Sequence, residues 1–522
     1  MKIRVFNGLT LGQRGRKKQQ PVFPQVENFY ADWRVRCGAA SVLHDENSVP
    51  PERLLQAVWR HQRLLRDQLK TAEGARVRVF HPGFLSVEGG PDFRGAVVQI
   101  GDQAPRTGDV EVDLRASGWH AHGHDRNPHF QNVLLHVVWD ETAPGVKGRV
   151  EGPPAVVSLK NSLDAPLAEL GLWLENESAA AFPEDLRGKC SGMLREWEEG
   201  RVDGLLRAAA QVRLEAKAAQ FHARARQAGW EQALWEGLFR GLGYKHNGWP
   251  MQNVAEARRQ WVRGGPTAFG LQARLLGLGG LLPAELPGGT SGAGPYLRRV
   301  WDCWWREREE FSDQLLPRAA WRFHGLRPAN HPARRLALAA HWLADENFIP
   351  KIEKWIATEF SMREHARKSR PEANPRTRHG EPAHSALKDL LQVEHDDFWS
   401  WHWTFRSARL KRAQPLLGAA RVTDLAVNVI LPWLWTRARE GRNEEIRQEV
   451  EERFFAWPAA EDNSVLKLAR QRLLGGPSRG RWRSAAGQQG LLQIVHDFCG
   501  HSNAVCENCR FPELVGGSGD ER

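Results

Sequence analysis

The hydrophobic pattern of this chain changes its period between residues 140 and 160. From residue 76 to residue 140, apolar side chains alternate with polar ones in short runs separated by glycine, proline and aspartate. A period of two is typical of half-buried β-strands. From about residue 160 onward, apolar residues recur at helical spacing, with breaks at 286–295, 365–385 and 474–482. The sequence therefore predicts an α+β protein, with a sheet first and a large, mainly α-helical body after it.

The N-terminal part contains one predicted helix and several predicted strands. Apolar residues recur at helical spacing between residues 50 and 70, which predicts an amphipathic helix. Strand patterns follow at 77–79, 96–100, 110–114 and 133–138. We expect four segments: a flexible basic arm at 1–25, an α/β domain at 26–160, a mainly helical domain at 161–490 and a cysteine-rich metal-binding tail at 491–522.

Length and composition are those of a globular protein. The 522 residues suffice for two or three domains, and 41% apolar with 26% charged residues is ordinary. The chain has no run of about eighteen apolar residues, so we expect no membrane span. The N-terminal segment lacks the apolar stretch of a secretory signal. Few, clustered cysteines then predict a cytoplasmic location, where thiols bind metals more often than they form disulfides.

The chain carries a net charge of +11, from 73 Lys and Arg against 62 Asp and Glu. Excess positive charge suits a polyanionic partner, because each phosphate that a Lys or Arg neutralises releases counterions. Nucleic acid is therefore the expected partner. The alternative is an arginine-rich composition whose charges lie on solvated helix faces.

Three carboxylates accompany the predicted strands. Asp92 follows a Gly-Gly-Pro turn, while Glu111 and Asp113 alternate along one strand and so point to the same face. If the strands pair as neighbours, the three carboxylates converge at one end of a sheet, and such oxygen ligands bind Mg²⁺ or Mn²⁺. A bound ion of this kind activates water and stabilises displacement at phosphorus. The alternative is an amphipathic strand with a solvated acidic face.

Two histidines follow these carboxylates. His122 and His124 are two residues apart and share a face if the segment is extended. They could be metal ligands, proton-transfer groups or phosphate contacts, and the alternative is a pair of neutral surface histidines.

Three cysteines lie close together near the C-terminus: Cys499, Cys506 and Cys509. C-x6-C-x2-C is a ligand spacing, because a C-x-x-C turn directs two thiolates at one metal while the third closes from a loop. Zn²⁺ and an iron–sulfur cluster both suit thiolates, and spacing does not choose between them. A fourth ligand is needed, and His496 and His501 are candidates. The alternative is a reduced tail without metal.

The helical body contains a basic and an aromatic segment. Arg327, Arg334 and Arg335 could follow a phosphate backbone, since guanidinium groups match phosphate geometry. Alternatively, this segment caps the next helix and the arginines pair with acids. The aromatic residues at 398–403 could stack on bases or form a core between helices.

Several short motifs stand out between residues 58 and 140. They are Gly-Pro-Asp-Phe at 90–93, Gly-Asp-Val-Glu-Val-Asp at 108–113, Trp119 with the two histidines, and Asn-Val-Leu-Leu-His-Val-Val at 132–138. Together with segments at 325–332 and 397–399 and the cysteine tail, they resemble the bacterial family of unknown function DUF2851 over most of the chain. The resemblance implies no activity. It does imply Cys190 as the fourth ligand, because the family tends to have a cysteine there.

A second resemblance implies chemistry. Pro-Asp92, eighteen further residues and Glu111-x-Asp113 are similar to the PD-(D/E)XK signature of restriction-endonuclease-like nucleases. This resemblance implies a mixed sheet with flanking helices, and Asp92 and Glu111 as metal ligands. The chain departs from the signature where Asp113 replaces the usual Lys, so Asp113 would be a third ligand. The missing positive charge would come from a neighbour: Arg115, His122 or His124.

The leading hypothesis is a metal-dependent nuclease-like protein that acts on DNA or RNA. Its alternative is a catalytically inactive nucleic-acid-binding or scaffold protein that keeps the nuclease-like fold and a structural metal site. One distant cysteine plus three near the C-terminus resembles the iron–sulfur site of certain helicase-associated PD-(D/E)XK nucleases, which implies a [4Fe–4S] cluster, with Zn²⁺ as the other possibility. Nothing in the chain resembles a P-loop, so any ATP-driven motor would be a protein partner.

Overall fold

The computed structural model describes residues 28–37, 49–86, 90–140, 154–174, 188–262, 267–286, 294–323, 326–357, 381–460, 463–474, 484–499, 506 and 509–516. The predicted basic arm at 1–25 and the candidate ligand His501 lie outside these residues. The division of the chain into four segments stays a prediction.

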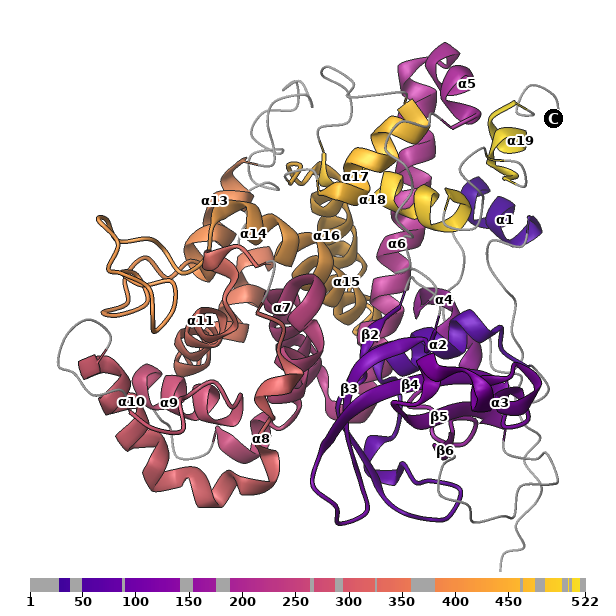
Figure 1. Ribbon diagram of the computed structural model, residues 1–522. Helices are drawn as coiled ribbons and strands as arrows, with labels where there is room; N and C mark the ends of the chain where they lie inside the picture. Colours follow the sequence, from indigo (N-terminus) through magenta and orange to yellow (C-terminus); the bar gives the residue numbers. More distant parts are fainter. Residues whose placement is uncertain are drawn as a thin grey trace, which may run out of the picture.

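A six-stranded mixed sheet forms the N-terminal part (Figure 1). The strands follow the order β1-β3-β4-β5-β6, and β2 pairs with β3 outside this order. β1, β3 and β4 pair antiparallel, whereas β4, β5 and β6 pair parallel. The strands are β1 (Val77–His81), β2 (Phe84–Leu85), β3 (Phe93–Ile100), β4 (Arg106–Arg115), β5 (Val133–Asp140) and β6 (Ala155–Ser158). The four predicted strand segments are therefore confirmed as parts of β1, β3, β4 and β5.

The predicted amphipathic helix is α2 (Glu52–His61). Its apolar side packs into the core of the sheet through Leu54, Leu55 and Val58, together with α4 (Leu167–Leu174). The helix ends at His61, because Gln62 takes a left-handed conformation with φ of 49°. α2 contacts β4, so its first turn lies near the strand that carries the predicted carboxylates.

One long helix joins the sheet to the rest of the molecule. α6 (Glu199–Ala228) contributes to three hydrophobic cores. Ala219 packs in the core of the sheet, Leu214 in the core of the helical body, and Leu205 in a third core that includes the C-terminal helix. The apolar residues of α6 therefore face different cores along its length. Figure 1 shows α6 running from the neighbourhood of α5 toward the sheet.

The mainly helical body is confirmed. The remaining helices are α1 (Phe29–Arg36), α3 (Gly118–Ala121), α5 (Cys190–Glu196), α7 (Trp230–Glu256), α8 (Arg258–Trp261), α9 (Ala268–Leu278), α10 (Gly294–Glu307), α11 (Pro332–Ala344), α13 (Glu381–Leu391), α14 (Ala419–Leu425), α15 (Leu431–Glu440), α16 (Glu444–Ala456), α17 (Ser464–Ala469), α18 (Ala485–Ile494) and α19 (Phe511–Gly516). Within the described ranges, no helix combines the length and the apolar character needed to cross a bilayer.

Candidate metal centre

Asp92 and Glu111 lie next to each other where β3 begins and pairs with β4. β3 begins directly after Asp92 and pairs with β4, which carries Glu111. The backbone N–H of Asp92 donates a hydrogen bond to Glu111 Oε2 at 3.0 Å, and the backbone N–H of Val112 donates one to Asp92 Oδ2 at 3.0 Å. Strand pairing therefore brings the two carboxylates together.

Asp113 lies between two histidines. Its Oδ2 is 2.8 Å from Nε2 of His136 on β5, and its Oδ1 is 3.2 Å from Nδ1 of His122. Because Glu111 lies opposite His136 in the parallel pairing of β4 and β5, His136 projects from the same face of the sheet. Asp113 and His136 are 3% and 1% exposed, so this contact is buried and fixes the direction of the carboxylate.

His122 and His124 lie in helical turns, so the condition of an extended segment is not met. His122 follows α3, and His124 begins the short 3-10 turn His124–Arg126. Gly123 between them has φ of 71°, a conformation that glycine adopts without strain. The ring of His124 stacks on Phe130 at 4.0 Å and lies 5.4 Å from Trp119. Turn geometry and aromatic packing, and not strand alternation, therefore direct these histidines toward the carboxylates.

Asp113 and the two histidines can bind one metal ion together. Asp113, His122 and His124 each offer a ligand atom, and these atoms lie within 4.8 Å of one another. His124 Nε2 is also 3.2 Å from Glu111 Oε1, but this buried nitrogen has no hydrogen-bond partner among the residues that the structure describes. A buried imidazole nitrogen beside carboxylate oxygens fits a divalent metal. Because the His122 side chain is 56% exposed, the centre is open to solvent on that side.

Gly118 allows this close packing. A Cβ atom at Gly118 would lie 2.7 Å from Asp113 Cγ and 2.8 Å from each of its carboxylate oxygens. A side chain at residue 118 would therefore displace Asp113 from between its two histidines.

Sequence reasoning missed three residues of the centre. Glu52 and Gln56 lie one turn apart on α2, and Gln56 Nε2 donates hydrogen bonds to Asp92 Oδ1 at 2.9 Å and to Glu52 Oε1 at 3.3 Å. His136 is the third. A lone histidine within an otherwise apolar strand was the signal that could have identified it. For the other two, the signal was a pair of polar residues four apart on the helix that precedes the sheet.

Burial changes the acidity of this cluster. It raises the pKa of Asp92 to about 7, with repulsion from Glu52 and Asp113 adding to the shift and hydrogen bonds from Val112 and Gln56 opposing it. Burial likewise raises the pKa of Glu111 to about 8, followed by repulsion from Asp92. The pKa of Glu52 is raised by the partial burial of its carboxylate and then by repulsion from Asp113. A divalent cation would offset the repulsion among these acids.

Two predicted nucleic-acid contacts are wrong. Arg334 and Arg335 on α11 are only 1% and 2% exposed. Arg334 donates hydrogen bonds to the carbonyls of Trp399, Gln414, Pro415 and Leu416. Arg335 donates to the Leu416 carbonyl and to Asn330 Oδ1. Neither guanidinium can reach a phosphate backbone, and the predicted pairing with acids is absent from these contacts too. Arg327 is exposed, and its role stays a prediction.

The aromatic segment forms a core. Phe398 is 5% exposed and Trp399 is fully buried. Phe398 stacks on Tyr296 at 4.1 Å and on His402 at 4.4 Å, and Trp399 Nε1 donates to Tyr296 Oη at 2.8 Å. These two rings are therefore not available to stack on bases.

The four predicted cysteine ligands lie at the opposite end of α6 from the sheet. Cys190 and Cys499 are buried in the third core, against which Cys509 also packs, and Cys506 is 5% exposed. The tertiary structure thus brings Cys190 to the C-terminal cysteines, far from the carboxylates.

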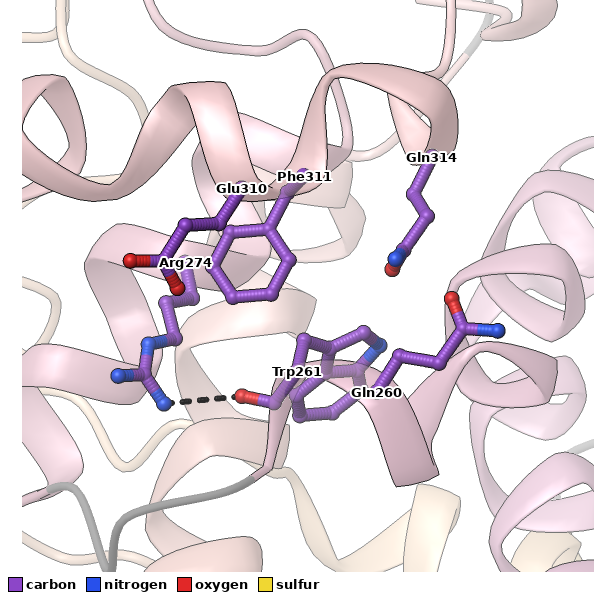
Figure 2. Close-up of a pocket in the computed structure, with 6 residues that line it drawn as sticks. All are labelled: Gln260, Trp261, Arg274, Glu310, Phe311 and Gln314. Carbon is purple, nitrogen blue, oxygen red and sulfur yellow. Dashed lines mark hydrogen bonds between the residues drawn. The ribbon is translucent and has the colours of Figure 1, made fainter.

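A cavity of about 280 Å³ lies within the helical body (Figure 2). Arg274 at its edge donates a hydrogen bond to the Trp261 carbonyl at 2.9 Å and forms an ion pair with Glu307. Its other lining residues are Gln260, Trp261, Glu310, Phe311 and Gln314. No residue of the candidate metal centre lines this cavity, so the cavity is separate from the predicted chemistry.

Fold and site together define an α+β protein in which a mixed sheet carries a partly buried cluster of carboxylates and histidines. A family model with the description "Protein of unknown function (DUF2851)" matches residues 52–464. The chain therefore belongs to this family, and the match spans the whole carboxylate and histidine cluster and Cys190. No curated protein and no solved structure matches the chain. The likeness to restriction-endonuclease-like nucleases stays a prediction.

Proposed function

We propose that this protein is a metal-dependent hydrolase that cleaves phosphodiester bonds in DNA or RNA. The observation that carries the proposal is the convergence of three carboxylates and two histidines on one face of the sheet: Asp92, Glu111, Asp113, His122 and His124. A centre that is buried on one side and open on the other can hold a divalent ion that also binds substrate. The net charge of +11 supports a polyanionic substrate.

The donor atoms favour Mn²⁺ over Mg²⁺. Asp113, His122 and His124 would hold the ion, with Glu111 beside His124 and Asp92 beside Glu111. Imidazole nitrogen suits transition metals, whereas Mg²⁺ prefers oxygen ligands and retains its waters. When bound, such an ion supplies a water of lowered pKa as the nucleophile.

The protein's own residues prepare the centre. His136 holds Asp113 in one direction, because the contact between them is buried. Asp92 and Glu111 would be ionised in the metal-bound protein, because the charge of the ion would offset the repulsion among these acids. The His122 side chain is 56% exposed beside Asp113, so a phosphate group could approach the centre from this side.

An inactive nucleic-acid-binding protein is the second candidate. The observation that favours it is Asp113 itself, which occupies the place of the expected lysine and is fully engaged by two histidines. An anion at this position cannot stabilise the negative charge that develops on phosphorus. For the protein to be an enzyme, Arg115, or a histidine that does not bind the ion, must then supply the positive charge.

Cleavage assays on the full chain test the proposal. Purified protein with Mn²⁺ is given single- and double-stranded DNA and RNA, and we expect cleavage that Asp92→Asn and Glu111→Gln each reduce by about 100-fold or more. Asp109→Asn is the matched control, because Asp109 lies on the same strand but accepts a hydrogen bond from the Gly95 backbone N–H at 3.0 Å. Undiminished cleavage by both Asp92→Asn and Glu111→Gln would refute the proposal that this centre cleaves phosphodiester bonds. Binding of nucleic acid without cleavage in Mn²⁺ or Mg²⁺ would decide for the inactive protein.

A further inference from the structure

Four cysteines from two distant parts of the chain meet at the N-terminal end of α6. Cys190 is the first residue of α5, Cys499 ends the π-helical turn Val495–Cys499, and Cys509 lies just before α19. Cys190 interacts electrostatically with the other three: Cys499, Cys506 and Cys509. In Figure 1, α5 and α19 lie at the same end of the molecule. We propose that these four cysteines hold a [4Fe–4S] cluster.

The chemistry of the four thiols calls for a bound cation. All four are free cysteines, and Cys190, Cys499 and Cys506 are buried. Cysteine sulfur is the ligand that zinc and iron–sulfur sites use, and four free cysteines gathered in one place match the number of ligands that either site needs.

Arg472 is the second observation that points to a negatively charged group. Its side chain is fully buried, and its Nη2 donates a hydrogen bond to Cys506 Sγ at 2.8 Å. The same guanidinium acts electrostatically on Cys499 and Cys509. A buried guanidinium that donates to a cysteine sulfur fits a site whose ligand sulfurs carry negative charge, as they do around a bound cluster.

Cys506 is held in an unusual backbone conformation. Its φ is 58°, in the left-handed region that residues other than glycine rarely adopt. Such a conformation persists only when the surroundings impose it, and it is common where a side chain must be aimed at a ligand.

The separation of the sulfurs favours a cluster over a single zinc ion. A tetrahedral zinc site with Zn–S bonds of about 2.3 Å holds its sulfurs roughly 3.8 Å apart. All four cysteines belong to the described part of the chain, and no three of their sulfurs lie within 4.8 Å of one another. A [4Fe–4S] cluster holds its ligand sulfurs farther apart, because four irons and four sulfides lie between them.

The cluster would fasten the C-terminal segment to the start of α6. The same core contains Tyr30 of α1, whose hydroxyl donates to Asp497 Oδ2 at 2.8 Å, and Arg34 of α1 pairs with the same carboxylate. Loss of the cluster should therefore loosen the third core and leave the carboxylate centre at the other end of α6 intact. The inference does not depend on the proposed hydrolase activity.

Anaerobic purification of the full chain tests the inference. We expect brown protein with iron and acid-labile sulfide at about four of each per chain, and Cys190→Ser and Cys506→Ser should each lose the visible absorption. Cys37→Ser is the close control, because Cys37 packs against the same core but donates to the Arg34 carbonyl at 3.5 Å. Cys303→Ser on α10 is the distant control. Both control variants should keep wild-type iron content.

The metal and sulfide content of the wild-type protein can by itself overturn the inference, so the test does not require that the variants fold. One zinc per chain without iron or sulfide would decide for a zinc site. Protein without iron or zinc after anaerobic reconstitution would refute a metal at these cysteines. Equal iron content in the wild type and Cys190→Ser would remove Cys190 from the ligand set.

Discussion

The backbone N–H of Asp92 donates a hydrogen bond to the carboxylate of Glu111 at 3.0 Å across β3 and β4. This contact brings two acids together in a buried environment where repulsion adds to the cost of ionisation. The pair is therefore poised to exchange protons for a metal ion.

The stability of the metal-free protein should depend on this pair between pH 4 and pH 8. The unfolded chain releases these protons near pH 4, while the folded protein holds them until the pKa values of about 7 for Asp92 and about 8 for Glu111. Their stabilising contribution is thus complete below about pH 4 and is lost as the pH rises through 7 and 8. Denaturant unfolding in chelator at several pH values measures this decline, which Asp92→Asn with Glu111→Gln should flatten. Identical profiles for wild type and double variant would show that these acids do not hold their protons.

His136→Ala should weaken Mn²⁺ binding by about 10- to 100-fold, because Asp113 loses the partner that orients it. Part of the affinity should return in His136→Gln, whose amide can donate to the same oxygen. Calorimetric titration of the metal-free protein with Mn²⁺ gives the dissociation constants. His129→Ala is the control, since His129 is exposed in the neighbouring turn. Unchanged affinity in His136→Ala would remove this residue from the centre.

Gly118→Ala should abolish metal binding while the protein remains folded. The added Cβ would lie within 2.8 Å of the Asp113 carboxylate, so Asp113 must leave its position between the histidines. Gly204→Ala is the matched substitution, because nothing lies within 4 Å of a Cβ at this exposed position of α6. The control should be neutral or stabilise the protein by up to about 1 kcal/mol through helix propensity. Mn²⁺ titration together with thermal unfolding separates the two effects. Normal Mn²⁺ binding by Gly118→Ala would contradict the crowding at Asp113.

Arg334→Ala should destabilise the protein by roughly 2–4 kcal/mol, because several carbonyls lose a charged donor inside the core. Arg327→Ala, at an exposed position, should change the free energy of unfolding by less than about 1 kcal/mol. Nucleic-acid affinity of the folded Arg334→Ala protein should equal that of the wild type. A specific loss of affinity with unchanged stability would return Arg334 to the binding surface.

Part of the candidate centre could be predicted from the sequence. Asp92, Glu111 and Asp113 follow from strand alternation and from the pairing of consecutive strands, both of which are short-range properties. Glu52 and Gln56 could not be found in this way, because their place depends on how α2 lies against β4. The prediction that Arg334 and Arg335 of α11 contact nucleic acid was wrong for a related reason. Charge alone predicts that an arginine lies on the surface. These guanidinium groups instead donate hydrogen bonds to carbonyls of a segment about eighty residues away.

The sequence by itself determined the sheet strands, the helix before them, the helical body and the family, since side-chain periods and short motifs are written in neighbouring residues. Only the tertiary structure decided which of those residues meet. It brought His136 to Asp113, turned His124 toward Glu111 and placed Cys190 beside the C-terminal cysteines. The physical reason is that contacts between distant segments depend on the packing of the whole chain around α6, which no local pattern contains.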